Sequence, residues 1–178
     1  MDTDQLFWAL ARVAGLASFA ALAISLVSGL TLRSGVLDWL GPNRHLRSLH
    51  EYTAVLWIPL GLLHVAALVL DQTARIGLLD VLVPFRMSYG TVAIGLGTVS
   101  LDIFAVVAIT GWLKRRLNAT LWQWVHRASY LAFSLLFLHA VLAGTDFNDP
   151  VISALTWSVA AVLALLSLAR LLWGRLPA

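Results

Sequence analysis

Five stretches of the sequence are almost continuously apolar, and the polar residues gather in the short segments between them. Each stretch exceeds the roughly 20 residues that a helix needs to cross the hydrocarbon core of a bilayer. The pattern therefore predicts an all-α integral membrane protein, a bundle of five transmembrane helices. The expected helices cover residues 6–32, 46–70, 91–113, 121–143 and 151–173.

The segments between the predicted helices contain turn-forming residues. The first contains Gly-Pro-Asn at 41–43, and the third and fourth, KRRLNAT and GTDFNDP, are short. The longest, residues 71–90, includes the apolar run IGLLDVLVPF. We expect this run to form a short helix in the membrane interface that stops before Pro84.

Composition agrees with a single membrane domain. Of 178 residues, 60% are hydrophobic and only 12% are charged, so a soluble fold would lack a polar surface. The net charge of +3 comes from basic residues near helix ends, which does not indicate nucleic-acid binding. The absence of cysteine excludes disulfides and iron–sulfur clusters and leaves histidine as the strong soft-metal ligand. The acidic start MDTDQ, followed by a long apolar run, is not typical of a cleaved signal peptide.

Lysine and arginine are distributed unequally between the two predicted sides of the membrane. With the N-terminus outside, the inner side holds nine of the twelve basic residues and the outer side three. Basic residues favour the cytoplasmic side, so we expect the N-terminus outside, the C-terminus inside and a location in the plasma or inner membrane. The inner nine are Arg33, Arg44, Arg47, Lys114, Arg115, Arg116, Arg127, Arg170 and Arg175.

Four of the five histidines fall at matched depths on two predicted helices. His50 and His64 are fourteen residues apart on the second long helix, and His126 and His139 thirteen apart on the fourth. Both helices run from inside to outside, so the histidines form two layers roughly 20 Å apart at the helical rise. Two layers suit two stacked b-type haems with His–His ligation, the inner one held by His50 and His126 and the outer one by His64 and His139. A zinc or copper site would need its ligands clustered around one ion.

The two histidine pairs differ in the angle between their members around the helix axis. Fourteen residues return to within about 40° of the same helix face, whereas thirteen residues leave His126 and His139 about 140° apart. A π-bulge or local unwinding near Ser129 or Ser134 would bring them to one face, and we predict one there.

Two motifs carry the histidines: RSLHEYTAVLWIPLGLLH contains H-x13-H, and WQWVHRASYLAFSLLFLH contains H-x12-H. They lie on two predicted helices with one further helix between them. This pattern resembles the ferric reductase-like transmembrane domain over about residues 5–145. That superfamily includes ferric-chelate reductases, NADPH oxidases and the haem-binding subunit of the periplasmic methionine sulfoxide reductase system. The resemblance implies two b haems on these four histidines and electron flow outward from the cytoplasmic face. Two departures stand out: five helices instead of six, and no FAD/NADPH domain after GRLPA, so we expect a partner to supply electrons.

Several further residues could support such haems. Trp57 and Phe133 lie midway between the histidines of their helices and could relay electrons or simply pack. Gly61 could allow close approach of a macrocycle or a helix. A carboxylate in the membrane, Asp102, indicates a function such as proton or quinol chemistry. The candidate cations for inner haem propionates, or for lipid headgroups, are Arg44, Arg47 and Arg127.

The leading hypothesis is therefore a b-type cytochrome that carries single electrons across the membrane and works as an electron-transfer subunit with a partner. The donor would be a separate flavoprotein or a quinol at the inner face. The acceptor would be an outer-face protein, ferric iron or oxygen. The alternatives are a cofactor-free bundle that acts as a proton path or assembly subunit, and a version with a single haem.

Overall fold

The structure is a computed structural model of residues 1–178, and it describes residues 2–35 and 43–173. The Gly-Pro dipeptide of the first predicted turn and Arg175 of the predicted inner side lie outside the described residues.

The predicted transmembrane helices are confirmed. The five long helices are α1 (Thr3–Ser34), α2 (Arg44–Leu70), α4 (Thr91–Trp112), α5 (Ala119–Ala143) and α6 (Pro150–Trp173). Within the described residues, these five are long and apolar enough to cross a membrane. Their ends differ from the predicted ones by no more than three residues. The protein is therefore an all-α, multi-pass membrane protein.

Polar residues between the helices fix where α5 and α6 begin. The side-chain oxygen of Asn118 accepts the N–H of Thr120 at 2.8 Å and caps α5. The carboxylate of Asp149 accepts the N–H groups of Val151 and Ile152 at 2.9 and 3.1 Å at the start of α6. These side chains satisfy backbone donors that have no partner inside the helix, which is most valuable near a membrane where water is scarce.

The short helix predicted before Pro84 is present, and its location in the membrane interface stays a prediction. Helix α3 covers Leu78–Leu82, and its C-cap residue is Val83, directly before Pro84. All three of its leucines are exposed, as expected for an apolar helix that meets lipid at the membrane surface. The segment after it is held by an ion pair between Arg86 and Asp80, with Nε and Oδ1 3.0 Å apart.

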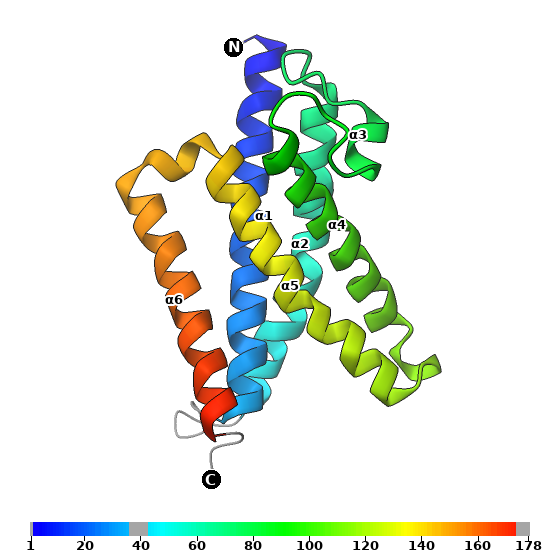
Figure 1. Ribbon diagram of the computed structural model, residues 1–178, viewed down its shortest axis with the longest axis vertical. Coiled ribbons are helices and arrows are strands. Elements are labelled where there is room, and N and C mark those ends of the chain that lie inside the picture. The colour runs from blue at the N-terminus through cyan, green and yellow to red at the C-terminus, as the bar shows by residue number, and fades with distance from the viewer. Residues whose placement is uncertain (1, 36–42, 174–178) are drawn as a thin grey trace. The chain divides into compact units, whose positions relative to one another are not determined.

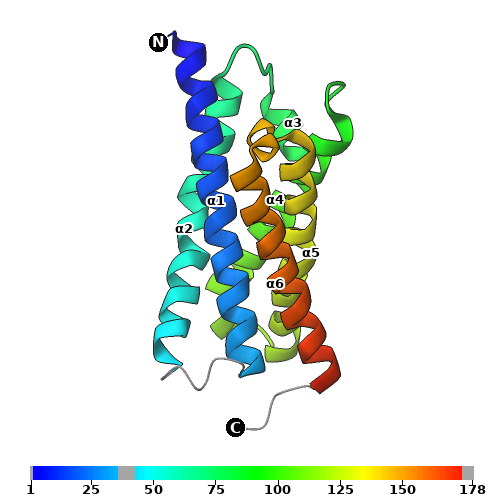
Figure 2. The ribbon, with the colours of Figure 1, turned by 90° about the vertical axis from the view of Figure 1, so that its left-hand side faces the viewer.

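The chain divides into two compact units. The first, here called the α4–α5 unit, contains residues 1–8 and 67–145, and the second, the α1–α2–α6 unit, contains residues 9–66 and 146–178. In the first unit α4 and α5 form an antiparallel hairpin through the 3-10 turn η2 (Lys114–Arg116), visible as the green and yellow-green helices of Figures 1 and 2. The Oγ of Ser100 donates to the carbonyl of Ala132 at 2.9 Å, and Phe104 and Phe133 are buried.

In the α1–α2–α6 unit, α1 and α2 run antiparallel (Figure 2). Small residues at buried positions of α1 allow close approach, and the Oγ of Ser18 donates to the carbonyl of Trp57 at 3.3 Å. The turn η3 (Thr145–Asn148) leads into α6. Within this unit Arg12 of α1 makes a two-bond ion pair with Asp146, and Phe19 meets Phe147 edge-on with ring centroids 6.1 Å apart.

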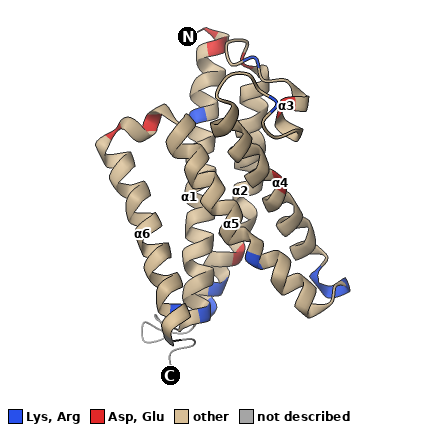
Figure 3. Cartoon of the chain, viewed as in Figure 1, with Lys and Arg blue, Asp and Glu red and all other residues tan. Residues whose placement is uncertain are grey.

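Most charged residues lie at or near the helix ends, whereas Asp102 lies within α4 and Arg127 within α5 (Figure 3). In the α1–α2–α6 unit, Arg33 ends α1, Arg44 and Arg47 begin α2, and Arg170 lies in the last turn of α6. Because α2 runs opposite to both α1 and α6, these four residues lie at one end of that unit (Figures 1 and 2). In the α4–α5 unit, Lys114, Arg115 and Arg116 occupy η2. This pattern is the one expected of spans whose apolar centres face lipid.

The Arg12–Asp146 ion pair generates a pH prediction. Hydrogen bonding to the Arg12 guanidinium lowers the pKa of Asp146 below its ordinary value, because the bond favours the ionised carboxyl. A lowered pKa stabilises the folded state above the unfolded-state value near 4, and that stability is lost as the pH falls through the native pKa. When the pH is lowered from about 6 to about 3, the melting temperature in detergent should decrease for both proteins. We expect the decrease to be a few degrees larger for the wild type than for Asp146→Asn. Equal pH dependence of the two chains would contradict this.

Candidate functional site

His64 is fixed to helix α1 by a hydrogen bond. Its Nδ1 lies 2.7 Å from the carbonyl oxygen of Ala11. A carbonyl can only accept, so Nδ1 carries the hydrogen and Nε2 keeps its lone pair. The contact needs a glycine one turn further along α1: a Cβ added at Gly15 would lie 2.8 Å from Nδ1 of His64.

His50 is fixed to α1 in the same way. Its Nδ1 lies 2.8 Å from the carbonyl oxygen of Ser25, and the hydroxyl oxygen of Ser25 is 3.2 Å from the same nitrogen. A Cβ added at Gly29 would lie 3.0 Å from the ring. The Nδ1–H form is again the one that the carbonyl requires, so the lone pair is on Nε2.

We call this arrangement a carbonyl–glycine seat: a helix carbonyl that accepts the imidazole N–H, together with the glycine four residues later. The carbonyl already accepts the N–H of that glycine within the helix and has a second lone pair for the imidazole. The two seats on α1 begin at Ala11 and Ser25, fourteen residues apart, which is the spacing of His50 and His64 on the antiparallel α2.

His139 occupies a third seat, on α4. Its Nδ1 lies 2.8 Å from the carbonyl oxygen of Ala93, and a Cβ added at Gly97 would lie 2.6 Å from Nδ1. This seat lies wholly inside the α4–α5 unit. Two helix pairs therefore hold an imidazole through the same kind of backbone contact, which keeps the lone pair on Nε2.

His126 has a different neighbour. Its ring stacks on that of Trp122, four residues earlier on α5, with centroids 5.2 Å apart and planes 16° apart. Gly111, fourteen residues after Gly97 on α4, has open space where a Cβ would stand.

The predicted π-bulge between His126 and His139 is wrong, because α5 is an uninterrupted α-helix from Ala119 to Ala143. Ser134 does bond back, to the carbonyl of Tyr130 at 3.0 Å, but the helix continues through it. Phe133 lies seven residues after His126 and Ala132 seven before His139, and seven residues return to within about 20° of one face. Both histidines thus share a stripe with a buried residue, and a broad buried face accommodates them without a bulge.

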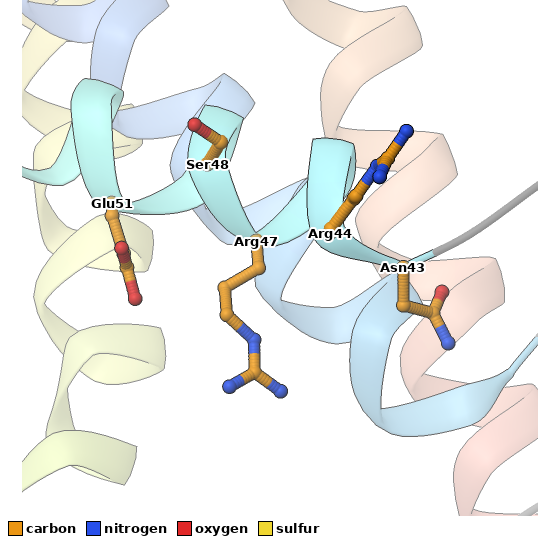
Figure 4. Close-up of a pocket in the computed structure, with 5 residues that line it drawn as sticks. All are labelled: Asn43, Arg44, Arg47, Ser48 and Glu51. Carbon is orange, nitrogen blue, oxygen red and sulfur yellow. The ribbon is translucent and has the colours of Figure 1, made fainter.

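Two candidate cations, Arg44 and Arg47, lie in the first turn of α2, whereas Arg127 is the ninth residue of α5. Arg44 and Arg47 line an open hollow with Asn43, Ser48 and Glu51, and their guanidinium groups point in different directions (Figure 4). The guanidinium carbon of Arg127 lies 4.9 Å from the ring centroid of Trp124, a cation–π contact.

The other candidates occupy mixed environments. Trp57 is buried in the α1–α2–α6 unit with its ring 3.4 Å from the Cβ position of Gly61, and Phe133 is buried in the α4–α5 unit. The side chain of Asp102 is exposed on α4, and no serine or threonine in the described part of the chain bonds to it. Among residues 2–35 and 43–173 there is no group of three or more His, Asp or Glu side chains that could hold a metal ion.

Sequence reasoning missed the contacts of Gly15 and Gly29 with the histidine rings. A signal for the α1 pair was available, because both glycines and histidines recur after fourteen residues. The stacking of Trp122 on His126 was also missed, since nothing in the spacing indicates a contact between these two rings.

The family model described as "Ferric reductase like transmembrane component" matches residues 14–137. The chain belongs to this family. Members sit in a bilayer, commonly bind haem and work with redox partners, so membership indicates a role in transmembrane electron transfer. Neither the curated proteins nor the solved structures gave a match.

The seat on α4 gives a matched pair of glycine variants. Gly97→Ala would force a methyl group against the His139 ring and should destabilise the protein by about 1–3 kcal/mol. Gly111→Ala meets open space in the same helix and should be neutral or stabilise by up to about 1 kcal/mol. Thermal unfolding in detergent measures both. If the two variants melted at the same temperature, the close contact at Gly97 would be refuted.

Proposed function

We propose that this protein is a di-haem b-type cytochrome that carries electrons across the membrane. His50 and His126 hold the inner haem, and His64 and His139 hold the outer one. The observation that carries the proposal is the tautomer of three of these histidines, each of which donates Nδ1–H to a helix carbonyl and so keeps its lone pair on Nε2. Metal-ligating histidines typically donate their second ring N–H to such an acceptor, which fixes the ring and raises the basicity of the ligand.

The residues present fit a haem better than a bare metal ion. Bis-histidine haem needs only two protein ligands, consistent with histidines that are not grouped in threes in the described structure. When bound, such a haem supplies a one-electron carrier whose iron changes oxidation state with little rearrangement. The chain supplies orientation through the carbonyl–glycine seats and an apolar environment that excludes water.

Basic residues near the inner-layer histidines support the proposed placement of haem carboxylates. Arg44 and Arg47 lie within two turns of His50, and Arg127 follows His126 directly. Each could neutralise a propionate through charge-assisted hydrogen bonds. The same bias of basic residues supports an N-terminus outside, a C-terminus inside and a location in the cell membrane.

The proposed electron path runs from an inner-face donor, a separate flavoprotein or a quinol, to an outer-face protein, ferric iron or oxygen. Trp57 and Phe133, both buried, would lie at the level between the two ligand layers of their helices. Asp102 is a candidate for proton or quinol chemistry, since a carboxylate within a span is costly unless it has a function.

Histidine variants test both haem binding and ligand pairing. Each single replacement of His50, His64, His126 or His139 by Ala should lower the haem content from about two per chain to about one. The double variant of His50 and His126 should keep about one haem, because both ligands serve the same site, whereas the double variant of His50 and His139 should keep none. Pyridine haemochrome absorbance per chain measures this, and His45→Ala, at an exposed histidine, is the matched control.

The outcomes separate the alternatives. A wild-type chain that stays colourless after haem-replete expression would favour a cofactor-free bundle. One haem in the wild type, lost only on replacing one pair of histidines, would favour the single-haem version. Retention of haem in the variant of His50 and His139 would refute the proposed pairing.

A further inference from the structure

The indole nitrogen of Trp122 is a buried hydrogen-bond donor without a partner in the described structure. Indole N–H groups that are closed off from water usually find an acceptor, because leaving one unpaired costs about 1–3 kcal/mol. The neighbouring tryptophans are of a different kind: Trp112 is 86% exposed and Trp124 65% exposed, as expected for rings at a membrane interface. The indole N–H of Trp122 therefore needs an acceptor that the described residues do not supply.

The ring of Trp122 lies against a proposed haem ligand. It stacks on the imidazole of His126 with planes only 16° apart. A flat neighbour of this size restricts rotation of the imidazole about its side-chain bonds, so it sets the plane in which Nε2 is presented. A carbonyl–glycine seat does the same for the other three ligands.

The place of Trp122 along α5 suggests the nature of the missing acceptor. It is one turn closer than His126 to the start of the helix, which is next to the basic turn η2 and so at the polar end of the span. A haem bound at His126 carries two propionate carboxylates that must extend toward that polar end, because charged groups are costly in hydrocarbon. A carboxylate oxygen is also the strongest acceptor such a haem offers.

We propose that Trp122 is a binding and positioning residue of the inner haem: its ring orients the imidazole of His126, and its Nε1–H donates a hydrogen bond to a haem propionate. This proposal rests on the proposed function. The hydrogen bond draws negative charge away from the iron, which favours the ferrous state. It also ties the macrocycle to α5 at a second point.

The test compares Trp122→Phe with the wild type and with Trp112→Phe, a matched control at an exposed tryptophan of α4. The full chain is used in the His64→Ala background, which keeps only the inner haem, and each protein is loaded with haem or with haem dimethyl ester. Trp122→Phe keeps a flat ring, so haem content and the low-spin spectrum should be retained. Its midpoint potential should become more negative, and haem should dissociate about 10- to 100-fold faster, as expected for loss of a hydrogen bond to a charged group.

The ester identifies the acceptor. Its methylated carboxyls carry no charge, so the difference between Trp122→Phe and the wild type should largely disappear with it. A third variant, Trp122→Leu, removes the flat ring and should also alter the electron paramagnetic resonance signal, which reports the orientation of the axial imidazoles.

Three results would overturn the proposal. The first is a Trp122→Phe chain with the same potential and dissociation rate as the wild type. The second is a difference of equal size with the ester, which would assign the N–H to lipid, water or the electron donor. The third is a Trp122→Leu spectrum like that of the wild type, which would refute the orienting role. Absence of haem from the wild type would instead refute the proposed function itself. If the His64→Ala chain fails to fold, the same differences are measured in the wild-type background, with His126→Ala as the reference that lacks the inner haem.

Discussion

The hydrogen bond from an imidazole Nδ1–H to a helix carbonyl is the interaction on which the rest of this structure depends. It occurs three times, at His50, His64 and His139, always with a glycine four residues after the accepting carbonyl. An imidazole in a membrane needs a partner for each nitrogen, because hydrocarbon offers none. The backbone satisfies Nδ1 and thereby keeps the lone pair of each ring on Nε2.

This requirement explains the composition of α1, whose backbone accepts two of these hydrogen bonds. More than half of the residues in the most apolar part of helix α1 are buried, compared with no more than 22% in the other spans. Alanine, serine and glycine are frequent along this helix. Without strong hydrophobic attraction between helices in lipid, small residues provide the close contact that holds them together. The same closeness lets a histidine of α2 reach the backbone of α1. The small residues of α1 thus allow both the packing of the two helices and the orientation of the imidazoles.

The other polar groups in the spans follow the same rule of internal satisfaction. Hydroxyls bond back to carbonyls one turn earlier, as Ser28, Thr31, Thr53 and Thr110 do. Ser18 and Ser100 instead reach a carbonyl of the neighbouring helix and tie the two helices of a pair. Against this background the unpartnered indole N–H of Trp122 is unusual, since each group named here has an acceptor. In a family associated with haem, a donor of that kind beside a histidine points to the cofactor.

The sequence by itself determined the five spans, the short helix before Pro84 and the family, because each depends on local periodicity or on a spacing that can be counted. It also singled out His50, His64, His126 and His139 as candidate ligands, since polar residues in apolar helices are costly and therefore conspicuous. Only the tertiary structure decided which nitrogen each seated imidazole offers, because that depends on a carbonyl of another helix many residues away. It likewise decided that α5 needs no bulge and that Trp122 stacks on His126, since the width of a buried face and the contact between two rings arise from packing, which spacing alone does not specify.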